Sequence, residues 1–409
     1  MFEVNKVRQD FPMLSYHDSK GNKQIYLDNG ATTFKPQAVI DAEVAYYTSF
    51  SANIHRGDYD LSLQADQAYD QARKIIARFI NCQSDEVIFT SGTTESLNMA
   101  AYGLRKLLHE GDVILSTLAE HASNILPWFR LAEQTGARVE FIELDEEGRL
   151  TVDNFRKALH DRVRIVAIAQ ITNVLGYCAD IKTISALAHQ KGAVVVVDGA
   201  QSVPHKKTDV KDLDCDLLAF SGHKMCGPTG IGVLYGKAEL LEKMEPMLLG
   251  GGANKRFNSQ GNLILSKVPD KFEAGTVPIA QAIGLARAAQ YLMDLGMENI
   301  EEYEKELHEY LVSQLKQLDN IDFYNPHSDA AISSVNVKGI FAQDAASYLN
   351  SKGIAVRSGN HCAKMLVEFL GTDATIRCSL YFYNTREEVD AFVQALKTCT
   401  LENCIDIFI

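Results

Sequence analysis

Apolar, strand-like runs alternate with helical periodicity through the middle of this 409-residue chain. The apolar runs cover residues 87–90, 112–116, 138–143, 163–170, 193–198, 216–220 and 231–235. Such alternation is typical of a mostly parallel sheet with helices on both faces. The sequence therefore predicts an α/β protein whose ligands bind beyond the carboxyl ends of the strands.

Helical periodicity and shorter apolar runs extend this pattern toward both ends of the chain. We expect helices near 36–49, 62–80, 278–295, 299–318 and 386–398, and further strands at 332–337, 353–357 and 375–381. Residues 237–275 leave the alternating pattern and suggest loop structure near a site or a subunit contact. We predict a large domain over 16–275 and a smaller α/β domain formed by 1–15 and 276–409.

Composition and charge narrow the class of protein. The net charge is −13, and the sequence contains no block of basic residues, so nucleic acid is not an expected partner. The N-terminal residues lack the apolar core of a signal peptide, and no apolar run is long enough to span a membrane. We therefore expect a cytoplasmic protein. The eight cysteines are scattered without zinc-binding spacing, and we expect no metal site.

The clearest chemical signal is the segment Ser221-Gly222-His223-Lys224, which follows the apolar run 216–220. A buried ammonium group is costly unless it is paired or neutralised. Condensation with an aldehyde neutralises a lysine and makes it chemically useful. We therefore interpret Lys224 as the lysine that holds pyridoxal phosphate as a Schiff base. A surface lysine in a turn is the alternative.

Asp198 ends the apolar run 193–198 and gives the second signal. A carboxylate at the end of a buried strand needs a cationic or donor partner. A pyridinium N–H is such a partner, and the protonated ring then accepts electrons from a bound amino acid. Gln201 could donate to the phenolic oxygen of the same ring. The alternative for Asp198 is that it caps the next helix.

Polar residues also follow three other predicted strands. Thr93 and Thr94 open a helix after residues 87–90 and fit a phosphate site at a helix N-terminus, although plain capping would explain them too. His121 could stack on a flat heterocycle or be structural. Asn173 could donate to a ring oxygen or serve as a turn residue before a glycine.

A second chemical centre is predicted around Cys362. Arg357, His361 and Lys364 lie close to it in the sequence, and nearby positive charge favours a thiolate. We therefore expect Cys362 to be the reactive thiol, with Cys226 as the rival because it lies two residues from the Schiff-base lysine.

Arg377 lies inside the predicted strand 375–381. A buried arginine needs a carboxylate partner, and a bidentate clamp on a substrate carboxylate fits this requirement. A structural salt bridge is the alternative.

Together these motifs resemble the fold-type I pyridoxal-phosphate enzymes, and within them the class V aminotransferase group. The chain is most similar to cysteine desulfurases of the SufS type (group II), a group that also includes selenocysteine lyases. The resemblance covers nearly the whole chain and rests on residues 27–33, 53–57, 90–95, 120–121, 197–201, 221–224, 272–276, 356–364 and Arg377.

The resemblance implies a role for each site residue. Lys224, Cys362 and His121 would be catalytic, with Cys362 as the nucleophile and His121 stacked on the ring. The residues implied in cofactor binding are Thr93, Thr94, His121, Asn173, Asp198, Gln201, Ser221, His223, Lys224 and Thr276. Thr276 would reach the cofactor phosphate of a neighbouring subunit, which implies a homodimer. The residues implied near the substrate are Asn173, Arg377, His55, Arg56 and Arg357.

The function implied is conversion of L-cysteine to L-alanine, with a persulfide formed on Cys362. The sulfur would pass to an acceptor protein of the SufU or SufE type for iron–sulfur cluster assembly. A selenocysteine lyase or another class V enzyme, such as an aminotransferase, is the alternative. The chain departs from the family pattern at Asn360, where a histidine is usual, and at Lys364, near the place of a common Gln-Pro pair. These departures leave open the proton handling of the loop and its choice of sulfur acceptor.

Overall fold

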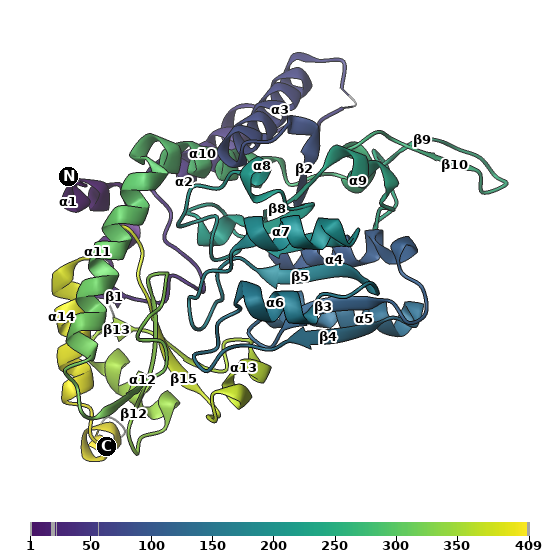
Figure 1. Cartoon of the computed structure of the whole chain (residues 1–409). Coiled ribbons are helices and arrows are strands. Elements are labelled where there is room, and N and C mark those ends of the chain that lie inside the picture. The colour runs from purple at the N-terminus through teal and green to yellow at the C-terminus, as the bar shows by residue number, and fades with distance from the viewer. Residues whose placement is uncertain (1, 18–20, 22, 56, 407–409) are drawn as a thin grey trace.

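The fold is centred on a seven-stranded sheet (Figure 1). The structure is a computed structural model, and it describes residues 2–17, 21, 23–55 and 57–406. In spatial order the strands are β2 (Val87–Thr90), β8 (Gly232–Gly236), β7 (Leu217–Ser221), β6 (Val194–Asp198), β5 (Val163–Ala169), β3 (Val113–Thr117) and β4 (Arg138–Ile142). Neighbouring strands are parallel except at β8, which runs antiparallel to β2 and β7. The predicted mostly parallel α/β sheet is confirmed.

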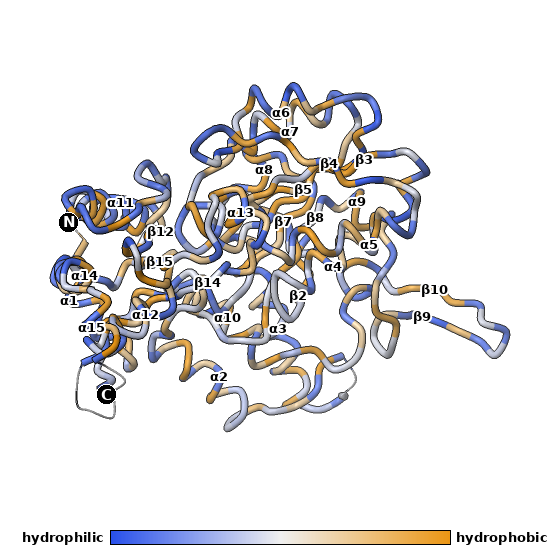
Figure 2. Tube along the Cα trace, turned by 90° about the horizontal axis from the view of Figure 1, so that it is seen from below, coloured by the Kyte–Doolittle hydropathy of each residue, from blue (hydrophilic) through white to orange (hydrophobic). Residues whose placement is uncertain are grey.

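Side-chain alternation along these strands builds an apolar layer on each face of the sheet. In β7, Leu218 and Phe220 join the core on one face, and Leu217 and Ala219 join the core on the other. Figure 2 shows the apolar strands at the centre of this unit. The first layer is covered by α2 (Gln37–Ser49), α3 (Asp60–Ile80), α6 (Val152–Ala158), α7 (Ile181–Gln190), α8 (Val210–Leu213) and α10 (Ile279–Leu295). The second is covered by α4 (Thr93–Gly103), α5 (Leu126–Thr135) and α9 (Ala238–Lys243).

Helix α3 shows how local sequence specifies one of these covering elements. Its buried residues follow the helical spacing of one apolar face: Ala65, Tyr69, Ala72, Ile76 and Ile80. The helix ends where Asn81 adopts a left-handed backbone with φ of 59°, a conformation that asparagine tolerates better than most residues.

A smaller unit packs beside the large sheet and has its own apolar core. Its antiparallel sheet has the order β11 (Ile321–Phe323), β12 (Ile332–Val337), β15 (Thr375–Ser379) and β14 (Arg357–Gly359). Strands β1 (Ile25–Tyr26) and β13 (Ile354–Ala355) form a separate parallel pair. The helices of this part are α11 (Met297–Leu315), α12 (Ala342–Ser351), α13 (Lys364–Phe369), α14 (Arg386–Lys397) and α15 (Leu401–Asp406).

The boundary between the two units does not follow a single point of the chain. Helix α10 packs on α2 and α3 and contributes to the core of the large unit, as do Val7, Phe11 and Leu14 near the N-terminus. The predicted division at residues 15/16 and 275/276 stays a prediction. The N-terminal segment itself contains α1 (Val4–Val7) and two short 3-10 turns, Arg8–Asp10 and Pro12–Ser15.

The segment expected to be loop structure, residues 237–275, contains helix α9 and a hairpin. The hairpin strands β9 (Asn254–Phe257) and β10 (Leu263–Leu265) project away from the body of the molecule in both Figure 1 and Figure 2. Among the residues that the structure describes, no helix combines the length and the apolar character that crossing a bilayer requires.

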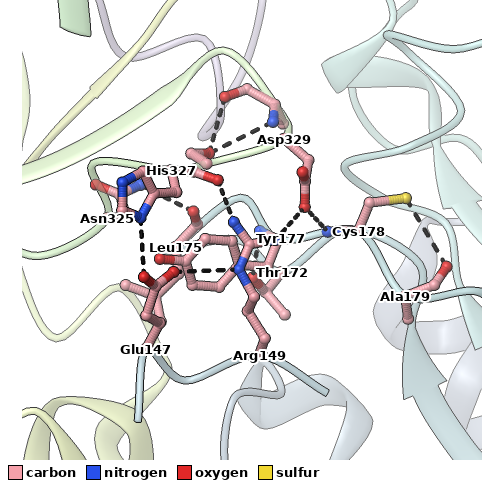
Figure 3. A network of polar contacts seen from close by, with 12 residues as sticks. Glu147, Arg149, Thr172, Leu175, Tyr177, Cys178, Ala179, Asn325, His327 and Asp329 are labelled. Atoms are coloured by element: carbon pink, nitrogen blue, oxygen red, sulfur yellow. Dashed lines mark hydrogen bonds and ion pairs between the residues drawn. The ribbon is translucent and has the colours of Figure 1, made fainter. Parts of the chain in front are cut away.

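A polar network joins the large unit to the small one (Figure 3). Arg149 Nη1 pairs with Asp329 Oδ2 at 2.9 Å, and its guanidinium lies 3.8 Å from the centre of the Tyr177 ring. The backbone N–H of Cys178 donates to the same carboxylate oxygen, and Asn325 Nδ2 donates to Leu175 O. These contacts hold the segment after β5 against the small unit.

A buried ion pair fastens helix α3 to the segment before α10. Arg73 forms two hydrogen bonds with the Glu273 carboxylate, each of 2.8 Å, and both side chains are almost fully buried. We expect Glu273→Ala to lower the free energy of unfolding by about 3–5 kcal/mol, because it leaves the Arg73 charge buried and unpaired. Denaturant titration measures this loss. Glu298→Ala is the control, since it removes a solvent-exposed pair with Lys207 and should leave the free energy of unfolding almost unchanged. Equal effects of both variants would contradict the prediction.

Candidate active site

The carboxyl ends of five strands of the large sheet meet at one pocket of about 230 Å³. The segments that follow β2, β3, β5, β6 and β7 line one side of it, and the small unit closes the other side. Of the residues predicted from the sequence, the pocket brings together Thr93, Thr94, His121, Asn173, Asp198, Gln201, Ser221, His223, Lys224, Arg357, Cys362 and Arg377.

Two of the predicted residues that the structure describes are not in this pocket. His55 and Thr276 line a second pocket, together with Asn53 and Glu273. Arg56 lies outside the described residues. Within the described residues, His55 and Thr276 are therefore not brought to the pocket of Lys224.

Lys224 lies on the 3-10 turn Gly222–Lys224, directly after β7. Burial, and then the positive charge of Arg377, lower the pKa of Lys224 to about 8, while Asp198 opposes this shift. A substantial fraction of the amine is therefore neutral near physiological pH and can act as a nucleophile or a base.

Asp198 is the last residue of β6 and is 6% exposed. Its Oδ1 accepts the backbone N–H of Ala200 at 2.9 Å. Burial raises the pKa of Asp198, although the Ala200 hydrogen bond and the charge of Lys224 partly oppose the rise. A positively charged donor beside this carboxylate would stabilise its ionised form.

Hydroxyl groups gather at the start of helix α4. The backbone N–H and the Oγ1 of Thr93 lie 2.8 and 2.6 Å from Ser221 Oγ, and Thr94 Oγ1 lies 2.8 Å from Ser123 Oγ. Gly92, the N-cap residue, has no side chain to cap this helix. Hydroxyls at an N-terminus without a side-chain cap form a place where an anion is stabilised.

His121 and His223, which follow strands of the large sheet, are neutral at physiological pH. Burial, followed by the charge of Lys224, lowers the pKa of His121 and of His223 to about 4 in each case. His121 Nδ1 accepts the backbone N–H of Ser123 at 3.1 Å, which leaves the proton on Nε2. A neutral imidazole of fixed orientation is suited to lie against a flat ring.

Arg377 lies on β15 and is 2% exposed. Its Nη2 pairs with Asp28 Oδ1 at 3.2 Å, and its Nη1 donates to Asn173 O at 2.9 Å. Its Nε has no hydrogen-bond partner among the described residues. The arginine is therefore both structurally paired and able to donate to an incoming carboxylate.

Cys362 follows β14 and reaches the pocket from the small unit. It is the exposed member of the eight free cysteines that the structure describes. The rival, Cys226, is fully buried, and burial raises its pKa to about 12. Accessibility therefore favours Cys362 as the reactive thiol.

Comparison with known proteins places the chain in a family. The Aminotransferase class-V family description matches residues 25–392. The chain belongs to the class-V aminotransferase family. This confirms the predicted family and supports the predicted cofactor, pyridoxal phosphate.

Several relatives and solved structures that are similar to this class-V chain are named cysteine desulfurases. A probable cysteine desulfurase of Synechocystis is 45% identical over 96% of this chain and 94% of its own length. The apo structure of a cysteine desulfurase from Thermococcus onnurineus NA1 is 40% identical, with a TM-score of 0.91 over 96% of this chain and 97% of that one. The S-sulfonic acid form of the Escherichia coli cysteine desulfurase CsdA is 36% identical, with a TM-score of 0.90 over 100% and 99%. The predicted activity agrees with these names.

The pocket of this class-V chain fits pyridoxal phosphate. Asp198 offers a carboxylate for the ring nitrogen, the hydroxyls at the start of α4 offer donors for the phosphate, and Lys224 offers the amine. Asn173 lines the same pocket, but its Nδ2 donates to His361 O at 2.8 Å, whereas Oδ1, an acceptor, has no hydrogen-bond partner in the described residues and can take a donor from a bound molecule. This set is what an aldehyde cofactor with a ring nitrogen and an anionic end requires.

Sequence reasoning missed two polar residues of the pocket, Ser123 and His361. Ser123 follows His121 in the same post-strand segment, and a hydroxyl after a strand end was a signal that could have identified it. The sequence suggests that His361 is a basic neighbour of Cys362. In the structure its ring is buried instead, and its Nε2 lies 2.9 Å from Thr375 Oγ1. Burial first, and then the charge of Arg377, lower the pKa of His361 to about 3.

Proposed function

We propose that this chain is a pyridoxal-phosphate-dependent cysteine desulfurase of the SufS type, which converts L-cysteine into L-alanine and carries the sulfur as a persulfide on Cys362. One observation carries the proposal: the amine of Lys224 and the exposed thiol of Cys362 line the same pocket, with Asp198 and Arg377. An aminotransferase needs the first of these groups but has no use for the thiol.

The residues of the large unit would hold the cofactor. Asp198 would pair with the ring nitrogen, His121 would lie against the ring, and Gln201 and Asn173 would contact its substituents. Thr93, Thr94, Ser221 and His223 would hold the phosphate. When bound, pyridoxal phosphate supplies an electron-accepting ring. With its lowered pKa, Lys224 takes the proton from the substrate α-carbon and returns a proton during product formation.

Cys362 would perform the sulfur transfer. Its thiolate attacks the sulfur of the bound cysteine, so that a sulfur–sulfur bond forms and the carbon–sulfur bond of the substrate breaks. The electron pair of the broken bond stays with the carbon skeleton, which is reduced and leaves as alanine after protonation. The Cys362 sulfur is oxidised to the persulfide. An acceptor protein of the SufU or SufE type would remove this sulfur for iron–sulfur cluster assembly.

Arg377 would bind the substrate carboxylate through its unpartnered Nε, with Arg357 at the pocket rim. We expect Arg377→Lys to raise KM for L-cysteine about 10–100-fold with a smaller change in kcat, because lysine keeps the charge but has no donor at the position of Nε. Steady-state kinetics over a range of cysteine concentrations measures this. An unchanged KM would remove Arg377 from the substrate site and leave it as the partner of Asp28.

We propose a homodimer in which residues 53–57 and Thr276 of one protomer complete the site of the other. The position of Asn53, Ile54, His55 and Thr276 in a separate pocket supports this proposal. Helix α2 also exposes Ile40, Val44 and Tyr47 at helical spacing, which gives an apolar stripe suited to a subunit contact. Sedimentation equilibrium of the purified protein tests it, and a monomer at micromolar concentration would contradict it. The cytoplasmic location stays a prediction.

The function is tested with L-cysteine, a reductant and the purified enzyme. We expect equal amounts of alanine and sulfide, and a mass gain of one sulfur atom on the peptide that contains Cys362 when the reductant is left out. Faster turnover of L-selenocysteine with little alanine from L-cysteine would favour the selenocysteine lyase. Amino-group transfer to a keto acid without sulfide release would favour the aminotransferase.

A further inference from the structure

The turn that carries Cys362 has an unusual backbone. Gly359, His361 and Cys362 have φ values of 121°, 52° and 57°. A left-handed backbone is unfavourable for residues other than glycine, and two such residues in succession need contacts that hold them. The position of the thiol therefore depends on what fixes this turn.

Three contacts fix the turn to the rest of the pocket. The His361 ring bonds to Thr375, and the His361 carbonyl accepts Asn173 Nδ2 at 2.8 Å. The Cys362 carbonyl accepts the backbone N–H of Ala122 at 2.7 Å. These contacts hold the carbonyl side of the turn, and none of them involves the N–H of Cys362.

Asn360 supplies the contact to the N–H of Cys362. Its Oδ1 accepts the Cys362 N–H at 3.1 Å, and its carbonyl accepts the N–H of Ala363 at 2.8 Å. A side-chain oxygen that accepts the N–H two residues ahead is a common way for asparagine to stabilise a turn. Asn360 itself is not among the residues that line the pocket.

We propose that Asn360 is a positioning residue that holds the Cys362 thiol toward the bound substrate. The proposal rests on the proposed function and adds a role for the residue that stands in place of the usual histidine. Asn360 acts through the backbone of Cys362 and touches neither cofactor nor substrate. Loss of its side-chain oxygen leaves the thiol chemically intact but lets it occupy orientations that do not reach the substrate sulfur.

The chain contains a second example of the same contact. His121 Nδ1 accepts the N–H of Ser123, two residues ahead, at 3.1 Å. A neutral imidazole can therefore replace the asparagine oxygen in such a turn, and a serine hydroxyl can do the same. Asn360→His and Asn360→Ser should keep the contact at pH 8, whereas Asn360→Ala removes it.

The test compares these three variants with the wild-type holoenzyme at pH 8. Rapid mixing with L-cysteine followed by mass spectrometry gives the rate of persulfide formation on Cys362, and iodoacetamide gives the intrinsic reactivity of the same thiol. We expect persulfide formation to be about tenfold slower in Asn360→Ala, as for the loss of one hydrogen bond. In Asn360→Ala, KM for cysteine, the absorbance of the bound cofactor and the alkylation rate should match those of wild type. Asn360→Ser and Asn360→His should lie within about threefold of wild type. Glu368→Gln, an exposed change on α13, is the control.

Three results would overturn the inference: an Asn360→Ala variant as fast as wild type, a serine variant as slow as the alanine variant, or parallel losses of alkylation and persulfide formation. The last would indicate a general loss of thiol reactivity. A wild-type enzyme that forms no persulfide would overturn the proposed function itself, and the inference with it. That result is distinct, because wild type and all variants would then be equally inactive toward cysteine.

Discussion

Replacing Lys224 with alanine will lower the rate of alanine formation from L-cysteine by roughly three orders of magnitude or more. The reason is that Lys224 lines the pocket with Asp198. In the proposed function it would both anchor the cofactor and move the substrate α-proton. Loss of the central group of a catalytic set removes most of the rate enhancement. The alanine assay measures the rate, and borohydride reduction of wild type followed by peptide mapping should label the peptide that contains Lys224.

Lys237→Ala is the matched control for this variant. Lys237 is a partly exposed lysine that pairs with Asp214 and Asp216, away from the pocket. It should retain wild-type activity and borohydride labelling at Lys224. If Lys224→Ala kept more than about a tenth of the wild-type rate, or if the label appeared on another lysine, the assignment of the cofactor amine would be wrong.

Replacing Cys362 with alanine will abolish sulfide and alanine release from L-cysteine and leave cofactor binding intact. The thiol is exposed at the pocket, whereas the residues that would hold the cofactor come from the large unit. Removal of the nucleophile stops the step in which the substrate carbon–sulfur bond breaks, and we expect a loss of at least about a thousandfold. The assay is read together with the absorbance of the bound cofactor, which should match that of wild type.

Cys82→Ala is the control for the thiol variant, because Cys82 lies after helix α3 and is partly buried. It should keep full activity. Full sulfide release by Cys362→Ala would show that another thiol or another mechanism takes the sulfur. Loss of the cofactor absorbance in that variant would show that the cysteine turn is needed to hold the cofactor. That result would contradict the proposal that residues of the large unit hold it.

Much of the large unit was predictable because apolar runs and strand ends are local features. Asp198 illustrates this: an aspartate that ends a run of valines predicts both a buried strand and a polar group at the ligand-binding edge. Lys224 followed in the same way from the end of β7. The strand β12 lies at the predicted residues 332–337.

Other features depend on contacts between distant parts of the chain and could not be predicted. The spatial order of the seven strands, and the antiparallel β8 within it, are set by packing rather than by any one run of residues. The backbone contact between Ala122 and Cys362 joins residues from different units. The left-handed backbone at His361 and Cys362 could not be predicted either, because histidine adopts it only in a minority of cases and cysteine is not enriched there.

The two apolar cores also have a consequence for how this enzyme can evolve. The groups expected to bind the cofactor follow strands of the large unit, while Cys362 and Arg377 lie on segments of the small unit. The polar network around Arg149 joins the two units. In the proposed function, mutations in residues 357–364 would act on the thiol turn and leave the residues expected to hold the ring unchanged. The thiol turn can therefore change by mutation separately from the cofactor pocket, provided that the contacts between the two units are kept.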